Sequence, residues 1–356
     1  MDRIYERFEK ILKILDIYGL EGLLLNAEPN VSYACGFHAP DSYALITAAG
    51  ITLITDFRYK ADFQKKITGP IQLLEYKGTF FKTIARLLKE KSVKHAGFES
   101  RRLTFAECEA LHKLAGKTSK FIPLKETVEP LREIKDAEEI KAIREAVKIT
   151  LKALSFIEKI LKPGMKELEA AAELERFIRM SGAEESAFKI IVASGPNSSY
   201  PHAEISSRRL KTGEPVVIDM GVAYNGYKCD LTRTFFLGKI NPSVRKVESI
   251  VREAQHRAIR HIRPGIPIKE IDFIARNYIA QKGFAKFFGH SLGHGIGLEV
   301  HESPSINKRN THRLKNGSVF TIEPGIYMAG EFGVRIEDMV LVTKEGAQVL
   351  SGDDRY

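Results

Sequence analysis

The stretch at residues 216–234 reads VVIDMGVAYNGYKCDLTRT, and the interpretation of the rest of the chain starts from it. Asn225 and Gly226 stand between two segments rich in apolar and β-branched residues, a pattern typical of a tight turn between antiparallel strands. With a two-residue turn, Asp219 and Asp230 point to the same face of the hairpin, opposite or diagonal to one another. Two carboxylates then share one patch. The alternative interpretation is that both are solvated residues at strand ends.

The composition is that of an ordinary folded protein. With 44% hydrophobic and 28% charged residues in a chain of 356, we expect two domains with ample cores. The net charge of +10 would suit a protein that binds nucleic acid. However, the basic residues are mixed with acidic ones in helical patterns, as in EEIKAIRE at residues 138–145. This distribution favours solvated helix faces, and we expect no nucleic-acid partner.

The cysteines and the N-terminus indicate a cytoplasmic protein. Cys35, Cys108 and Cys229 are far apart and form no C-x-x-C pair, so neither a disulfide framework nor a thiolate zinc site is indicated. The first ten residues carry too many charges for a signal peptide. No apolar run approaches the ~18 residues of a membrane span, and we expect no membrane association.

Residues 1–125 are predicted to form a small α/β domain, because helical and strand patterns alternate along them. Residues 123–130 carry a proline at each end and are predicted to be a linker. The elements predicted before it are helices over residues 2–18, 79–91 and 104–115 and strands over residues 22–25, 43–47, 51–55 and 95–99.

Residues 126–356 are predicted to form the second domain, in which two halves resemble each other. Each half has a helix, a Pro-Gly pair, a second helix and then strands, although the residues themselves match weakly. We therefore predict an internal repeat. Its helices are expected over residues 136–161 and 166–181 in one half and over residues 242–262 and 267–282 in the other.

A glycine-rich loop forms the second cluster of polar residues. Residues 289–302 read GHSLGHGIGLEVHE, with three histidines and four glycines. Glycines permit tight turns and close backbone approach, so the imidazoles can point inward from an irregular loop. A single histidine is more often a hydrogen-bonded core residue than a ligand, but three in such a loop favour a site.

The third cluster comprises FTIEPGIYM at residues 320–328 and FGVRIED at residues 332–338. A three-residue turn centred on Gly330 would place Glu323 across from Glu337, with Arg335 on the same face as Glu337. The alternative is an ordinary hairpin with two exposed glutamates. Because Glu323 follows a mostly apolar strand, we expect it to be buried.

If the two hairpins face each other with the histidine loop between them, four carboxylates converge in a partly buried place. Repulsion and desolvation would force several of them to bind protons unless cations compensated. Two divalent ions about 3.5–4 Å apart, bridged by carboxylates and a hydroxide, would form a two-metal hydrolase centre. Oxygen ligands with one imidazole suit manganese, cobalt, iron or zinc.

Five residues in these contexts, Asp219, Asp230, His294, Glu323 and Glu337, resemble the metal ligands of the pita-bread metallopeptidases, specifically Xaa-Pro dipeptidases (prolidases) and aminopeptidases P. The resemblance covers essentially the whole chain. It implies an α+β protein with a creatinase-like N-terminal domain at residues 1–125. A pita-bread catalytic domain with pseudo-two-fold symmetry would follow at residues 126–356.

The resemblance also implies roles for the five ligands. Asp219 would bind one metal, Asp230 and Glu337 would bridge both, and His294 and Glu323 would complete the other shell. A hydroxide that bridges the metals would be the nucleophile. Glu323 would carry its proton to the leaving amine.

Four further residues would serve the substrate, a proline-containing dipeptide or short peptide cut at its Xaa-Pro imide bond. His202 and His301 resemble the family histidines that hold the substrate and the developing oxyanion. His290 and Arg335 would contact the substrate or support the ligands, and a salt bridge that orients a ligand carboxylate is an equal alternative for Arg335. A homodimer is expected, as in relatives.

Three rival interpretations arise from the same architecture. A methionine aminopeptidase shares the five ligands but usually lacks a domain like residues 1–125. A creatinase has both domains but has lost the metal-binding acids, all of which are present here. A non-catalytic binding module would show eroded ligands. Whether the peptidase prefers dipeptides or longer peptides depends on a wall beyond proline, which the sequence leaves open.

Overall fold

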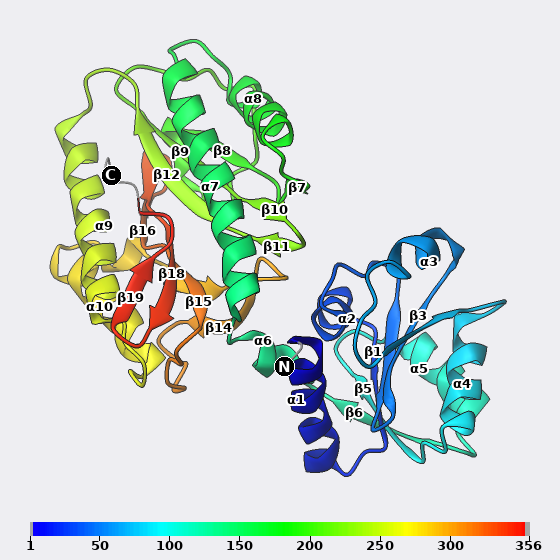
Figure 1. The fold of residues 1–356 in the computed structure, drawn as a ribbon. Helices are drawn as coiled ribbons and strands as arrows, with labels where there is room; N and C mark the ends of the chain where they lie inside the picture. The colour runs from blue at the N-terminus through cyan, green and yellow to red at the C-terminus, as the bar shows by residue number, and fades with distance from the viewer. Residues whose placement is uncertain (1–2, 353–356) are drawn as a thin grey trace. The chain divides into compact units, whose positions relative to one another are not determined.

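The computed structural model describes residues 3–352 and divides into two compact units (Figure 1). The first unit extends to Arg132, and the second begins at Glu133.

The first unit is built on a six-stranded mixed sheet with strand order β4-β3-β2-β1-β5-β6. Helices α4 and α5 pack against one face of this sheet through a core that includes Leu24 and Leu45, while α1 and α2 lie on the other side (Figure 1). The elements are α1 (Arg3–Tyr18), β1 (Gly22–Leu25), α2 (Glu28–Cys35), β2 (Tyr43–Thr47), β3 (Gly50–Thr55), α3 (Phe57–Phe63), β4 (Ile71–Glu75), α4 (Phe80–Glu90), β5 (His95–Glu99), α5 (Phe105–Ala115), β6 (Lys120–Leu124) and α6 (Glu129–Arg132).

The stretch predicted as a linker, residues 123–130, belongs instead to the first unit. Pro123 lies in β6, which pairs only with β5 at the sheet edge, where a residue without an N–H group is tolerated. Farther along, the Glu129 carboxylate accepts hydrogen bonds from the Thr127 backbone and from Asn30, and Arg132 donates to Asn30 at 2.7 Å. These contacts hold α6 to the first unit, so the chain leaves it after Arg132 and not after residue 125.

The second unit has four long helices and four small sheets. Asp136 caps the first helix and forms a capping box with Glu139, as the acidic residues of its first turn predict. The elements are α7 (Ala137–Ile160), α8 (Glu167–Met180), β7 (Glu185–Ser186), β8 (Ile191–Ser194), η1 (Gly195–Ser199), β9 (Pro215–Met220), β10 (Val222–Tyr224), β11 (Tyr227–Lys228), β12 (Leu231–Phe236), α9 (Pro242–His261), α10 (Ile268–Gln281), η2 (Ala285–Phe287), β13 (Gly293–Gly295), β14 (Glu302–Ile306), β15 (Val319–Ile322), β16 (Gly325–Met328), β17 (Phe332–Arg335), β18 (Asp338–Thr343) and β19 (Gly346–Val349).

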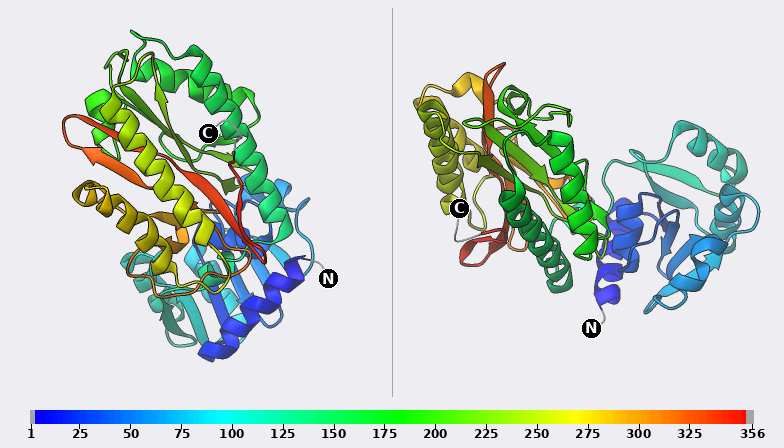
Figure 2. Two further views of the ribbon diagram at one scale, coloured as in Figure 1. Left: turned by 90° about the vertical axis from the view of Figure 1, so that its left-hand side faces the viewer. Right: turned by 90° about the horizontal axis from the view of Figure 1, so that it is seen from above.

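The predicted internal repeat is present in this second unit. Helices α7 and α8 cover one core with β9 and β12, and α9 and α10 cover a second core with β15 to β18 (Figures 1 and 2). The connections match in detail. Gly164 donates its N–H to Leu210 O at 2.9 Å, and Gly265 donates to Leu314 O at 2.8 Å. The two halves therefore repeat one helix–helix–strand unit. Each half contributes one antiparallel strand pair, β9 with β12 and β15 with β18.

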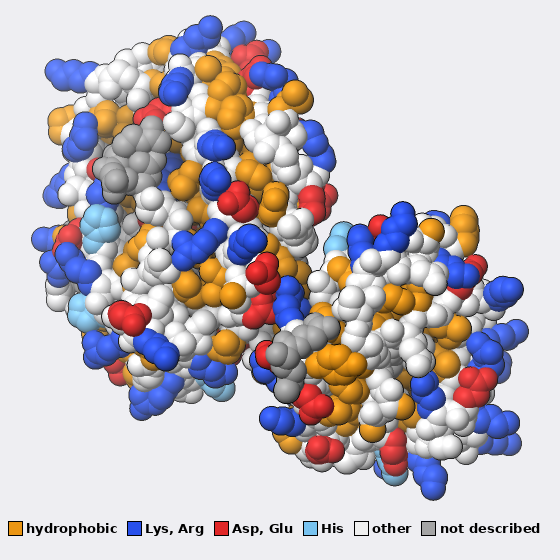
Figure 3. All heavy atoms as spheres, viewed as in Figure 1, with side chains coloured by type: hydrophobic (Ala, Val, Ile, Leu, Met, Phe, Trp, Pro, Cys, Tyr) orange, Lys and Arg blue, Asp and Glu red, His pale blue; other side chains and the backbone are white. Residues whose placement is uncertain are grey.

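The surface agrees with the charge pattern of the sequence. Lys and Arg side chains are spread over the face shown in Figure 3 and do not gather in one patch there. Within residues 3–352, no helix is both long and apolar enough to cross a bilayer.

Candidate metal centre

The hairpin of residues 216–234 forms as predicted. Asn225 and Gly226 have φ values of 49° and 76°, which a two-residue hairpin turn requires at both central positions. Tyr224 pairs with Tyr227, and the same register continues to Asp219 opposite Thr232. Asp230 is two residues before Thr232, so the two aspartates lie diagonally on one face of the hairpin.

Gly221 allows this hairpin to bend between the aspartates. A Cβ atom at this position would lie 1.8 Å from the backbone oxygen of Cys229. Only a glycine leaves room for this approach, and at this point the strand pair passes from the β9–β12 sheet to the β10–β11 sheet.

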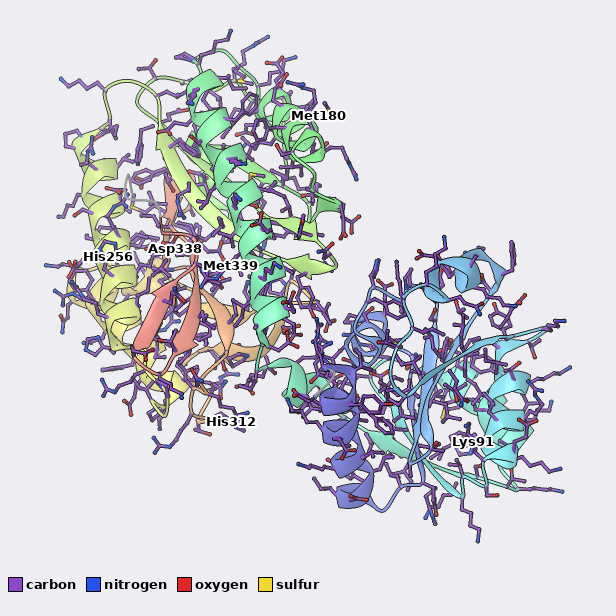
Figure 4. All side chains as sticks on the ribbon, in the orientation of Figure 1. Lys91, Met180, His256, His312, Asp338 and Met339 are labelled. Carbon is purple, nitrogen blue, oxygen red and sulfur yellow. The ribbon has the colours of Figure 1, made fainter. Side chains whose placement is uncertain are left out.

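The second hairpin also has the predicted register. Ile322 pairs with Asp338 and Gly325 pairs with Arg335, with a three-residue turn centred on Gly330. Glu323 and Glu337 therefore lie across from each other where β15 gives way to β16. Asp338 and Met339 continue the second strand between α9 and α7 (Figure 4).

The two hairpins meet at Thr232 and Glu337. The backbone N–H of Glu337 donates to Thr232 O at 3.1 Å, and the Thr232 hydroxyl donates to Glu337 Oε2 at 2.7 Å. This contact joins the aspartate hairpin to the glutamate hairpin, so all four carboxylates share one buried region.

His294 enters this region from β13. Its Nε2 atom lies 3.5 Å from Asp230 Oδ2 and 3.4 Å from Glu323 Oε1, longer than an ordinary N–H···O hydrogen bond. Its Nδ1 atom lies 3.1 Å from Gly295 O. The tautomer that donates from Nδ1 to this carbonyl leaves the Nε2 lone pair directed at the carboxylates.

The electrostatics of the cluster call for positive charge. Burial and the neighbouring Glu337 raise the pKa of Glu323 to about 8, and burial and Asp219 raise the pKa of Glu337 to about 8. Burial, with Glu337 as the next cause, also raises the pKa of Asp230 well above its usual value. Four clustered carboxylates can stay ionised together at neutral pH only if a cation offsets their repulsion and desolvation.

The donor atoms fit divalent cations. Within residues 3–352, three buried carboxylate oxygens have no hydrogen-bond donor, namely Asp219 Oδ1, Asp230 Oδ1 and Glu337 Oε1. Ligand atoms of Asp230, His294 and Glu337 lie within 4.8 Å of one another. Two ligands at about 2.1 Å from one ion lie about 3–3.5 Å apart, close to the His294–carboxylate distances. Oxygen atoms with one imidazole nitrogen suit a divalent metal ion.

Arg335 is the cation that faces Asp219. Its Nη2 donates to Asp219 Oδ2 at 2.7 Å, its Nε donates to Thr232 Oγ1 at 3.0 Å, and its Nη1 donates to Tyr327 Oη at 2.8 Å. Its side chain is 5% exposed. Of the two predicted roles for Arg335, this geometry favours the salt bridge that orients a ligand carboxylate. The sequence interpretation missed both Thr232 and Tyr327.

Tyr327 had a signal in the sequence. It stands two residues after Gly325 and pairs with Gly333, and a Cβ atom at either glycine would lie within 2.8 Å of its side chain. Two glycines around an aromatic residue on the face of Glu323 indicate that its ring packs over the backbone there. This pattern could have identified it.

The other three histidines lie around the carboxylates. The rings of His294 and His301 are 4.1 Å apart between centroids, and His290 Nε2 lies 3.1 Å from the Tyr327 hydroxyl. Burial, with His294 as a second cause, lowers the pKa of His301, and burial likewise lowers the pKa of His290 to about 4. Eight of the nine residues singled out from the sequence are thus linked by these contacts, and the ninth, His202, follows Pro201, whose carbonyl accepts a hydrogen bond from Arg335 at 3.1 Å.

The fold and this cluster define a metallopeptidase architecture. The model of the metallopeptidase family M24 matches residues 141–344, and that of the creatinase/prolidase N-terminal domain matches residues 7–134. The chain belongs to metallopeptidase family M24, with a creatinase-type domain before its pita-bread catalytic domain. The resemblance and fold class inferred from the sequence are therefore confirmed, and the family implies divalent metal ions.

Relatives match over nearly the whole length of the chain. An Xaa-Pro dipeptidase of Pyrococcus horikoshii is 38% identical over 100% of this chain and 99% of its own, and an uncharacterized peptidase, YqhT, of Bacillus subtilis is 37% identical over 97% of each. The structure of an Xaa-Pro dipeptidase from Bacillus anthracis superposes with a TM-score of 0.95 at 38% identity and covers 98% of both chains. An X-Pro aminopeptidase from Thermotoga maritima has a TM-score of 0.90 at 36% identity, over 98% of this chain and 99% of its own.

Proposed function

We propose that this chain is a two-metal exopeptidase that cleaves the imide bond before proline at the N-terminus of dipeptides or short peptides. The observation that carries this proposal is the convergence of four carboxylates and His294 in one buried cluster, in which three carboxylate oxygens have no donor among residues 3–352. The whole-length similarity to proteins named Xaa-Pro dipeptidase and X-Pro aminopeptidase supports the substrate class.

In this proposal the two ions share five protein ligands. Asp219, Asp230, His294, Glu323 and Glu337 would hold these ions. The separations of 3.4 and 3.5 Å from His294 Nε2 to Glu323 and Asp230 support a shared ion. Manganese, cobalt, zinc and iron all suit this set of oxygen and imidazole ligands.

Bound divalent ions would supply an acidified water and a polarised scissile carbonyl. Glu323 then serves as the proton carrier. Its carboxylate, next to the Thr321 hydroxyl at 3.2 Å, takes a proton from the attacking water and delivers it to the proline nitrogen as the carbon–nitrogen bond breaks. The hydroxyl remains on the carbonyl carbon, so water is divided between the two products.

The surrounding histidines bind the substrate. His301 and His202 are solvent-exposed at the rim of the cluster, where either can donate a hydrogen bond to the carbonyl oxygen as it gains charge. Proline suits such a site, since its imide nitrogen carries no N–H donor and peptidases that require that donor cannot use it. His290, beside Tyr327, is proposed as a further substrate contact.

The length preference separates the two activities within this proposal. Hydrolysis of Gly-Pro and of Gly-Pro-Pro should be compared on the same protein with added manganese or cobalt. Efficient cleavage of the dipeptide alone identifies an Xaa-Pro dipeptidase, and cleavage of the tripeptide alone identifies an aminopeptidase P. Cleavage of neither peptide, with a methionine-initiated peptide cut instead, would replace the proposal with a methionine aminopeptidase.

Glu323→Ala tests the proton carrier. We expect turnover to disappear while the fold persists, because the substituted side chain cannot accept or return a proton. Glu331→Ala, at the exposed tip of the same hairpin, is the matched control and should keep wild-type turnover. Unchanged activity in Glu323→Ala would rule out this mechanism.

A homodimer and a cytoplasmic location complete the proposal. Light scattering coupled to size-exclusion chromatography measures the first, and fractionation of the source cells measures the second.

A further inference from the structure

Glu302 occupies a central place in the histidine loop. It follows His301 in the chain, begins β14 and pairs with Gly295 of β13, the residue after His294. The Glu302–Gly295 pair therefore stands at the base of both rings, whose centroids lie 4.1 Å apart. A contact that fixes Glu302 also fixes where the His301 side chain leaves the backbone.

Lys135 makes that contact from another part of the second unit. Its Nζ atom lies 2.7 Å from Glu302 Oε1, and the two side chains are only 1% and 6% exposed. The backbone N–H of Lys135 donates to Gly317 O at 2.9 Å, and Ile134 forms a β-bridge with Ser318. The backbone that carries Lys135 is thus anchored to the segment that leads into β15, the strand before Glu323.

The loop packs closely around this ion pair. A Cβ atom at Gly297 would lie 2.6 Å from Glu302 Oε1 and 3.1 Å from Lys135 Cε. The carbonyl of Gly297 accepts a hydrogen bond at 2.8 Å from the backbone of Lys228, two residues before Asp230. The loop that carries His301 is therefore tied to the aspartate hairpin through Gly297 and, through the ion pair, to the segment before β15.

Stability alone does not explain a pair of this kind. Two charges removed from water lose hydration that their mutual attraction offsets only in part, so an apolar pair of similar volume would often serve stability equally well. A charged pair differs from an apolar pair in that its geometry is directional.

We infer that Lys135 and Glu302 form a positioning pair that holds His301 toward the substrate at the metal centre. The inference rests on the proposed function, because it assigns the pair to the placement of a substrate-binding histidine. Neither residue touches the reacting atoms.

The test compares wild-type protein with Lys135→Met, Glu302→Gln and the double variant, all loaded with the same metal. Each single variant removes one half of the buried ion pair and should unfold at a lower temperature, whereas the double variant removes both charges of the pair and should regain most of that loss. We expect the double variant to keep the metal stoichiometry of the wild type, while kcat for the cleaved Xaa-Pro peptide falls about 10–100-fold with a smaller change in KM.

Lys315→Met is the matched control. Lys315 Nζ lies 2.8 Å from Glu133 Oε2, so this variant breaks another ion pair of the segment that carries Lys135, one that does not reach the histidine loop. Its kcat should match that of the wild type. Equal losses in Lys315→Met and the double variant would overturn the inference.

Two further measurements separate this inference from the proposed function. In a His301→Ala background, the double substitution should lower kcat less than twofold, and multiplicative losses would contradict the inference. Histidine ring signals in NMR spectra, with that of His301 assigned from His301→Ala, should shift or broaden in the double variant and stay unchanged in Lys315→Met. An unchanged His301 signal overturns the positioning role, even if the wild-type protein cleaves no proline peptide.

Discussion

Arg335 donates a hydrogen bond from Nη2 to Asp219 Oδ2 at 2.7 Å, and the other nitrogens of its guanidinium reach Thr232, Tyr327 and the carbonyl of Pro201. One rigid, planar group thus orients a carboxylate of the first hairpin from a strand of the second. Because Asp219 Oδ1 is left without a donor among residues 3–352, this arrangement presents that oxygen to an ion.

Replacement of Arg335 by lysine should therefore weaken metal binding. The lysine ammonium carries the charge but cannot form the same fork of hydrogen bonds. We expect the dissociation constant for manganese to rise about 10–100-fold, as measured by isothermal titration calorimetry. Wild-type affinity in Arg335→Lys would show that Asp219 needs only a positive charge nearby.

Thr232→Val should also weaken metal binding, in this case through Glu337. The hydroxyl of Thr232 donates to Glu337 Oε2, and valine keeps the shape of the side chain but removes the donor. Metal affinity should fall by about tenfold. Thr234→Val is the control, because the Thr234 hydroxyl bonds only the backbone carbonyl of Arg335 among the contacts seen here and should leave metal affinity nearly unchanged.

Gly221→Ala should open the aspartate hairpin. Since a Cβ atom would lie 1.8 Å from the Cys229 oxygen, the strands must separate, and the free energy of unfolding should fall by about 3 kcal/mol with a loss of metal affinity. Gly330→Ala is the control. Its Cβ would meet no atom within 4 Å, and only its φ of 75° opposes alanine, at a cost of about 1 kcal/mol. Denaturant unfolding of both variants measures the difference.

His290 should make stability depend on pH. Burial, the largest cause, lowers its pKa to about 4, whereas the unfolded chain has a pKa near 6.5. Between pH 4 and pH 6.5, His290 therefore binds its proton more tightly in the unfolded chain than in the folded protein. Stability is therefore fully present above pH 6.5 and is lost as the pH falls toward 4.

His290→Gln removes that contribution. From pH 7 to pH 4.5, the wild type should lose roughly 1 to 3 kcal/mol more of its free energy of unfolding than the variant. Both proteins are unfolded by denaturant in the presence of a chelator, so that release of metal does not contribute. Parallel pH curves would contradict the lowered pKa.

Local sequence patterns predicted the site well. The register of each hairpin follows from a short turn and from the two-residue alternation of strands. It could therefore be predicted that Asp219 and Asp230 share one face of their hairpin and that Glu323 lies opposite Glu337. The contacts of Arg335 with Asp219 and Thr232 could not be predicted, because they depend on how two hairpins more than 100 residues apart meet.

The first unit was harder to predict in detail. Helices α2 and α3 and strand β4 are only five to eight residues long, too short for periodicity to distinguish them. The linker prediction was wrong because Pro123, read as a breaker, lies in an edge strand that does not need its N–H.

The central claim is that the carboxylates converge because two divalent ions neutralise them. The most direct measurement is the number and position of ions in crystals of the manganese-loaded protein, from anomalous diffraction at the manganese edge. We predict two peaks per chain, both within ligand distance of the cluster formed by Asp219, Asp230, His294, Glu323 and Glu337. A single peak, or peaks away from these side chains, would contradict the claim.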